Sequence, residues 1–243
     1  MEQGCASATP GLVLAVRPEF QRGKFFVGWR EGALLVQRGS IAVLVDAPPG
    51  TQLGAEAALI QSIVLSSGRM QAIGGLLPVL AALEPHRVAN VPLRVHCPLG
   101  EERAPSLLAV WSQGWPDRYP LTLDSAFPGS QFEVDQLGFE TLPVISGEVQ
   151  WHRREVTPQV AVAVKIIAPE ATVVWVPAAA PDAGLRRICA GADLAVVEVG
   201  VEEWPRTPER WRLAVTDALH IGSDVGELWI VGDDGSMGVG ETQ

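Results

Sequence analysis

Residues 41–83 read IAVLVDAPPGTQLGAEAALIQSIVLSSGRMQAIGGLLPVLAAL. The apolar, β-branched run Ile41–Val45 ends at Asp46, which is typical of a short buried strand. A second strand is predicted at Ser62–Leu65, and the pattern from Met70 to Leu83 favours a helix. Between the two strands, the residues from Thr51 to Ile60 also favour a helix, with Thr51 as its N-cap. The stretch therefore predicts the strand–helix alternation of an α/β sheet.

The flanking sequence extends this pattern in both directions. From Leu12 to Ala47, short apolar runs separated by Pro and Gly predict a β-meander. After residue 125 a second series begins with strands and continues with helices at Ala183–Ala190 and Pro208–Leu219. We therefore expect an α/β fold: a four-layer αββα sandwich of two mixed β-sheets with helices outside. We also expect one domain over residues 1–243, made of two pseudo-repeated halves at about 1–125 and 126–243.

Composition excludes several classes of protein. The 243 residues carry 28 Asp and Glu against 18 Lys and Arg, a formal charge of −10, so no basic field attracts nucleic acid. Cys5, Cys97 and Cys189 lie far apart without CxxC spacing, which indicates a reducing compartment and no zinc cluster. The first residues, MEQGCASATPG, lack the basic and apolar pattern expected of a secretory signal, and residues 160–180 favour two strands over a membrane helix. We expect a soluble, cytoplasmic protein with no membrane partner.

Three segments carry a resemblance to a known family. Asp46 closes a strand, Ile73–Leu76 reads Ile-Gly-Gly-Leu at the start of a helix, and Gly191–Glu198 reads GADLAVVE. With these segments the chain resembles the metallo-β-lactamase fold superfamily from Ile41 to Asp233, in the order of every element. The segment WVPAAAPDAGLRRICAGADLAVVEVGVEEW is similar to the branch that holds the pyrroloquinoline quinone biosynthesis B proteins and the phosphonate-pathway phosphodiesterases.

The resemblance implies a metal site whose ligands are absent from this sequence. The family carries a His-x-His-x-Asp-His loop before its Gly-Gly-Leu helix. At those four ligand positions the chain has Ser67, Arg69, Gln71 and Ala72; at the later bridging Asp and terminal His it has Ala178 and Gly232, with Asp233 one place along. Of the four histidines in the chain, His152 alone lies in the region of the remaining metal-binding His.

The positive charge of Arg69 also disfavours a metal ion at this position. A guanidinium about 4 Å from a divalent ion costs on the order of 4 kcal/mol per unit charge at an effective dielectric of 20. We therefore expect no metal at the family position and no cofactor.

The substituted positions still define a candidate pocket. Its residues are Asp46, Ser67, Arg69, Gln71, His152, Glu198 and Asp233. In one interpretation the loop Ser66–Arg69 binds a phosphate- or carboxylate-bearing ligand, because it enters a helix N-terminus and Arg69 adds a bidentate donor. In the other, the serines cap the helix and Arg69 fills the volume of the metal, paired with Glu198 or Asp46. Asp46 is then an acceptor for loop N–H groups.

Two functions follow from these interpretations. The first is a catalytically silent binding or scaffold module, whose partner is a protein or a small anionic ligand; Trp residues in predicted loops, such as Trp115 and Trp204, are typical of interfaces. The alternative is a hydrolase-like or pyrroloquinoline-quinone-pathway enzyme with a rebuilt site. A metal-free enzyme with Ser67 as nucleophile is a third option, for which His152 alone could serve as base. A homo-oligomer is compatible with each.

Overall fold

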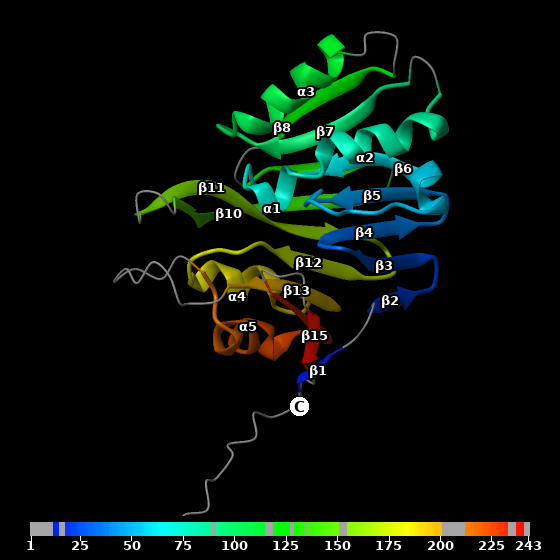
Figure 1. Cartoon of the computed structure of the whole chain (residues 1–243). Helices are drawn as coiled ribbons and strands as arrows, with labels where there is room; N and C mark the ends of the chain where they lie inside the picture. The colour runs from blue at the N-terminus through cyan, green and yellow to red at the C-terminus, as the bar shows by residue number, and fades with distance from the viewer. Residues whose placement is uncertain are drawn as a thin grey trace, which may run out of the picture.

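Two β-sheets face each other in the computed structural model, and helices cover their outer surfaces (Figure 1). The structure describes residues 12–14, 18–88, 91–114, 119–126, 129–134, 136–150, 155–200, 212–232 and 237–240. His152 and Asp233, two of the predicted site residues, lie outside these ranges.

The first sheet has seven strands in sequence order. Strands β2 to β5 form an antiparallel meander, and strands β5 to β8 run parallel to one another. The strands are β2 (Glu19–Arg22), β3 (Phe25–Arg30), β4 (Ala33–Arg38), β5 (Ile41–Val45), β6 (Ile60–Val64), β7 (Leu93–Pro98) and β8 (Leu121–Ala126).

The second sheet has eight strands in the order β1-β15-β14-β13-β12-β11-β10-β9. Strands β12, β13 and β14 are parallel to one another, and the remaining pairs are antiparallel. The strands are β1 (Leu12–Leu14), β9 (Gln131–Val134), β10 (Leu137–Gln150), β11 (Glu155–Ile167), β12 (Thr172–Val176), β13 (Leu194–Val199), β14 (Glu227–Gly232) and β15 (Met237–Gly240).

Alternation along each strand divides the core into three layers. In β4, Leu34 and Val36 face the second sheet, whereas Ala33 and Leu35 face the helices. Helices α1 (Met70–Ile73), α2 (Leu76–Leu83) and α3 (Arg103–Gly114) cover the first sheet, and α4 (Ala183–Cys189) and α5 (Val215–Ile221) cover the second. The expected four-layer αββα sandwich is confirmed.

Two predicted helices are shorter or more interrupted in the structure than the sequence indicated. The expected helix at Thr51–Ile60 is a 3-10 turn, η1 (Ala55–Leu59), because the Thr51 hydroxyl donates back to the Pro48 carbonyl instead of capping a helix. The expected helix at 70–83 breaks into α1 and α2, because the Gly75 N–H donates to the carbonyl of Ala47 at 2.7 Å. Local periodicity could not show either bond.

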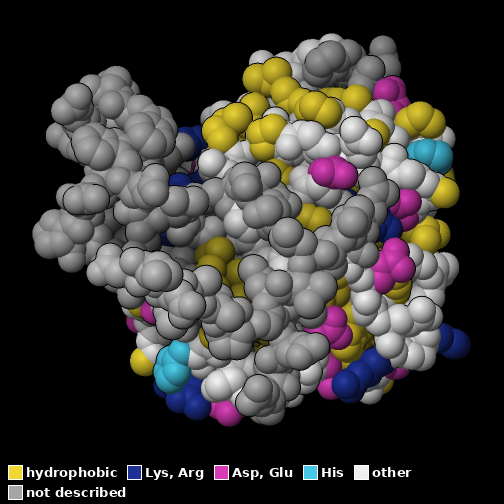
Figure 2. Space-filling view, turned by 60° about the horizontal axis from the view of Figure 1, so that its bottom comes forward, with side chains coloured by type: hydrophobic (Ala, Val, Ile, Leu, Met, Phe, Trp, Pro, Cys, Tyr) yellow, Lys and Arg dark blue, Asp and Glu magenta, His cyan; other side chains and the backbone are white. Residues whose placement is uncertain are grey.

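The C-terminal helix lies close to its expected position. The helix expected at Pro208–Leu219 is observed in part as α5 (Val215–Ile221): residues 201–211 lie outside the described ranges, and residues 212–214 are not helical. Two further short 3-10 turns are η2 (Glu84–His86) and η3 (Gly222–Asp224). Within the described ranges, no helix is both long and apolar enough to cross a membrane. On the face shown in Figure 2, the described Asp and Glu side chains are spread out and Lys and Arg form no broad patch.

Candidate functional site

The candidate site lies where the carboxyl ends of the parallel strands of both sheets meet. In the first sheet β5 ends before Asp46 and β6 ends before the loop Leu65–Arg69. In the second sheet β12 ends before Ala178, and Glu198 is the penultimate residue of β13. Crevices at this edge are where open α/β sheets bind ligands.

Asp46 joins the loop after β6 to the opposite sheet. Its Oδ1 accepts a hydrogen bond from the Ser66 N–H at 2.7 Å, and its Oδ2 accepts from the Ser66 hydroxyl at 2.7 Å. The indole N–H of Trp175, in β12, also donates to Oδ2 at 3.0 Å. Asp46 is therefore an acceptor for loop N–H groups, as expected, and it also receives the Trp175 bond, which the sequence did not indicate.

The loop Ser66–Arg69 does not cap a helix in the expected way. Ser66 is committed to Asp46, and the Ser67 Oγ accepts from the Arg69 N–H at 3.4 Å. Arg69 itself is the N-cap of α1, which has four residues and no side-chain cap. The prediction that the serines cap this helix is wrong, because the Asp46 carboxylate takes the Ser66 hydroxyl.

Arg69 is buried in the centre of the site with 2% of its surface exposed. Its Nη1 donates to the carbonyl of Ala178 at 3.4 Å, and its Nη2 lies 3.6 Å from Glu198 Oε1. Glu198 Oε2 accepts from the Ala178 N–H at 2.9 Å. Of the two expected partners of Arg69, Glu198 is therefore the observed one. The Ser146 hydroxyl donates to the same Ala178 carbonyl at 2.6 Å.

Burial and neighbouring charges shift two pKa values at the site. Burial raises the pKa of Asp46 from 3.8 to about 7 against the opposing effect of the Ser66 and Trp175 hydrogen bonds, and the nearby charge of Glu198 raises it further. Burial also lowers the pKa of Arg212, and the charge of Arg69 lowers it further, whereas Glu198 raises it. The centre thus gathers two arginines and two carboxyl groups.

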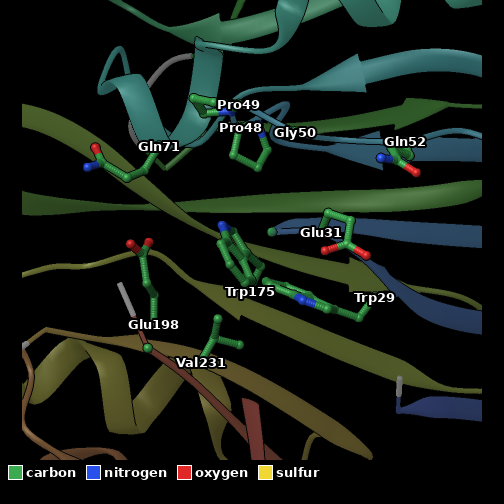
Figure 3. Close-up of a pocket in the computed structure, with 12 residues that line it drawn as sticks. Trp29, Glu31, Pro48, Pro49, Gly50, Gln52, Gln71, Trp175, Glu198 and Val231 are labelled. Carbon is green, nitrogen blue, oxygen red and sulfur yellow. The ribbon is translucent and has the colours of Figure 1, made fainter. Parts of the chain in front are cut away.

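A cavity of about 610 Å³ opens beside this centre. Figure 3 shows Trp175 and Trp29 between its two ends, with Pro48 and Pro49 opposite them. Glu198 and Gln71 lie toward one end, and Glu31 and Gln52 toward the other. The volume is in the range of small-molecule sites.

The structure brings some predicted site residues to the cavity and others behind it. Glu198 and the exposed Gln71 line it, as does Gly232 at the end of β14. Asp46, Ser67 and Arg69 are buried and belong to the hydrogen-bonded layer behind it. The expected interface residues Trp115 and Trp204 are outside the described ranges, as is Cys5, whereas Cys97 and Cys189 are buried and free.

Sequence inspection missed the walls of the cavity. Trp29 and Trp175 come from strands of different sheets, and their ring centroids lie 5.9 Å apart. Ser146 was also missed, because a serine in the middle of a strand carries no signal until its partner, the Ala178 carbonyl, is known. The Pro48–Pro49 pair was visible as a turn signal, but nothing local indicated that it faces the tryptophans.

The residues present do not fit the metal that the fold implies. A catalytic metal site needs about three imidazoles or carboxylates converging on one point. Here the central side chain is a buried guanidinium, and no group of three or more His, Cys, Asp or Glu capable of holding an ion occurs among the described residues. His96, on β7, stacks on Phe132 with centroids 4.5 Å apart, as an ordinary strand histidine.

Comparisons with solved structures agree with this fold. The chain is similar to the metallo-β-lactamase fold protein YhfI from Bacillus subtilis, with a TM-score of 0.61 and 15% identity over 82% of this chain and 76% of that one. It is similar to zinc-bound PqqB from Methylobacterium extorquens, with a TM-score of 0.61 and 16% identity over 83% and 77%. A diphosphatase of the PhnP family gives a TM-score of 0.57 and 18% identity over 83% and 74%.

The likeness to these structures is one of fold. No protein-family model and no curated protein matches the chain. At identities of 15–18% the likeness shows a shared metallo-β-lactamase fold, and the activity of each neighbour remains its own.

Proposed function

We propose that this chain is a ligand-binding module of the metallo-β-lactamase fold in which an Arg69–Glu198 ion pair replaces the metal centre. The observation that carries the proposal is the position of Arg69: its guanidinium, 2% exposed, lies 3.6 Å from Glu198 and 3.4 Å from the Ala178 carbonyl. In the proposed correspondence, Arg69 stands where the family has a metal-binding His and Ala178 where it has the bridging Asp. A fixed positive charge therefore occupies the point where the fold would bring a cation.

The cavity supplies the binding half of the proposal. Its 610 Å³ volume adjoins the ion pair, and Glu198 belongs to both. Its lining combines tryptophan and proline side chains with carboxylates and amides that could orient a small molecule. The Arg69–Glu198 pair fills the proposed metal position and packs behind the cavity wall. It does not activate a water molecule as a metal ion would.

A second candidate is a metal-free enzyme with a rebuilt site that binds an anion. It is favoured by Arg69 Nη2, which makes no hydrogen bond within the described residues, and by the raised pKa of Asp46, because shifted pKa values cluster at functional sites. The ion pair with Glu198 weakens it, because an anion would have to compete with that carboxylate.

Metal content separates the binding module from a metallohydrolase. The chain is expressed in medium containing zinc, manganese and iron, and the purified protein is analysed by elemental mass spectrometry together with a variant carrying Ser67→His, Arg69→His, Gln71→Asp and Ala72→His. We expect the variant to retain metal and the wild type to retain none. Stoichiometric metal in the wild type, with hydrolysis of a phosphodiester that follows the metal content, would refute the proposed function.

A further inference from the structure

Two tryptophans and two prolines form part of the wall of the cavity beside Glu198, and the tryptophans present only narrow surfaces to it, since Trp29 is 6% and Trp175 2% exposed. The rings of Trp29 and Trp175 are tilted by 38° at a centroid distance of 5.9 Å, and Pro48, Pro49 and Val231 complete the apolar lining. Figure 3 shows the two tryptophans side by side between the ends of the cavity. The negative π-face of tryptophan attracts cations more strongly than that of the other aromatic side chains.

Carboxylates supply the charge of the lining. Among its described residues, Glu31 and Glu198 are the charged ones, and both are acidic. Each lies toward one end of the tryptophan pair with an amide near it, Glu198 with Gln71 and Glu31 with Gln52 (Figure 3). This arrangement places negative charge and hydrogen-bond acceptors on both sides of an aromatic wall.

The positive charge of Arg69 is not part of that lining. Its guanidinium is buried and pairs with Glu198, so the carboxylate faces the cavity and the guanidinium does not. Helix α1 has only four residues, too short to present an anion site at its N-terminus. The net charge of −10 also favours the approach of a cation.

We propose that the cavity binds a small organic cation: an amine or quaternary ammonium with an apolar body that packs on Trp29 and Trp175 while Glu31 and Glu198 balance its charge. This ligand class rests on the proposed binding function and makes it specific. A cavity of 610 Å³ accommodates such a ligand. Desolvation at the tryptophan wall strengthens the cation–π attraction relative to an exposed surface.

Calorimetry and tryptophan fluorescence with defined probes test the ligand class. The probes are benzyltrimethylammonium and agmatine as cations, with phosphate and pyrophosphate as anions. We expect saturable binding of a cation with one site per chain, and no binding of the anions. Neopentylbenzene, the neutral carbon analogue of benzyltrimethylammonium, keeps the apolar body and lacks the charge, so it is expected to bind more weakly.

Two substitutions at the exposed residue Gln52 should change cation affinity in opposite directions without disturbing the fold. Gln52→Glu should tighten cation binding and Gln52→Lys should weaken it, each by about three- to five-fold, the size of one partly solvated charge interaction. Glu31→Gln should weaken it similarly. Glu133→Gln, which removes an exposed carboxylate on β9 outside the cavity, is the matched control and should leave affinity unchanged.

Each outcome distinguishes the two proposals. Anion binding that Gln52→Lys strengthens would overturn the cation class and leave the binding module intact. Failure of both cations to bind would also overturn the inference. Metal retention with phosphodiester hydrolysis would refute the proposed function itself, whatever the probes do.

Discussion

Asp46 Oδ2 and Trp175 Nε1 lie 3.0 Å apart in a hydrogen bond that joins the two sheets. Asp46 follows β5 of the seven-stranded sheet, and Trp175 is in β12 of the eight-stranded one. The same carboxyl group holds the Ser66 N–H and hydroxyl, so the loop leading to Arg69 is fixed through it. One buried carboxyl group therefore positions both the loop that leads to Arg69 and one tryptophan of the cavity.

This carboxyl group predicts an unusual pH dependence of stability. The folded-state pKa of Asp46, about 7, exceeds its unfolded value near 3.8, so the native state binds more protons between these values and the free energy of unfolding falls as pH rises through them. The loss is on the order of 4 kcal/mol and is complete above pH 7. Urea unfolding from pH 5 to pH 8 covers the upper part of this range and should show a fall of about 3 kcal/mol in the free energy of unfolding.

Asp46→Asn is the control for that slope. Asn tolerates the left-handed backbone at this position, where φ is 62°, and it does not titrate. The pKa of His96 is lowered by burial and so contributes a slope of opposite sign, but equally in both proteins. The wild type should lose stability relative to Asp46→Asn between pH 5 and pH 8. A constant difference across that range would show that Asp46 stays ionised throughout.

The Arg69–Glu198 pair should show strong coupling. Arg69→Met leaves a carboxylate that still reaches the cavity and should cost about 3 kcal/mol, whereas Glu198→Gln leaves a buried guanidinium and should cost up to about 5 kcal/mol. The double variant should cost clearly less than the sum, because neither charge is then left alone. Equilibrium unfolding in a double-mutant cycle checks this, and additivity within about 0.5 kcal/mol would contradict it.

The fold could be predicted further from the sequence than the site. A strand such as β5 is recognisable from its apolar, β-branched run and from Asp46 after its end, and the order of elements predicted the sandwich. The break between α1 and α2 could not be predicted, because the Gly75 N–H leaves the helix for the Ala47 carbonyl, a tertiary contact.

At the site, residue identity indicated what was absent but little of what replaces it. The sequence showed an arginine at position 69 but not its partner. Arg69 pairs with Glu198 and not with Asp46, because the Asp46 carboxyl group already accepts from Ser66. The cavity depends on Trp29 and Trp175 meeting across two sheets. Neither relationship is encoded in a local pattern.

Gly75 should be intolerant of any side chain. A Cβ there would lie 2.1 Å from the Pro48 carbonyl oxygen, a backbone atom of the cavity wall. Gly75→Ala should therefore destabilise the protein by about 1–3 kcal/mol or more and disturb the cavity. Gly114→Ala is the matched control, because a Cβ at that position meets nothing within 4 Å. Thermal unfolding of the two variants compares them, and equal melting temperatures would contradict the proposed close approach.

Ser146 should stabilise the site through the backbone of Ala178. Ser146 is 1% exposed, and its hydroxyl donates to the Ala178 carbonyl at 2.6 Å. Arg69 donates to the same carbonyl. Ser146→Ala should cost about 1 kcal/mol, the usual net value of such a bond, because Arg69 still satisfies part of the acceptor. Ser106→Ala removes an exposed hydroxyl that donates to the Glu102 carbonyl and should cost less. Denaturant unfolding ranks the two. The Ser146 effect should also grow in the Arg69→Met background, because the Ala178 carbonyl then loses both of its side-chain donors, whereas an unchanged cost there would show that Ser146 and Arg69 stabilise the fold independently.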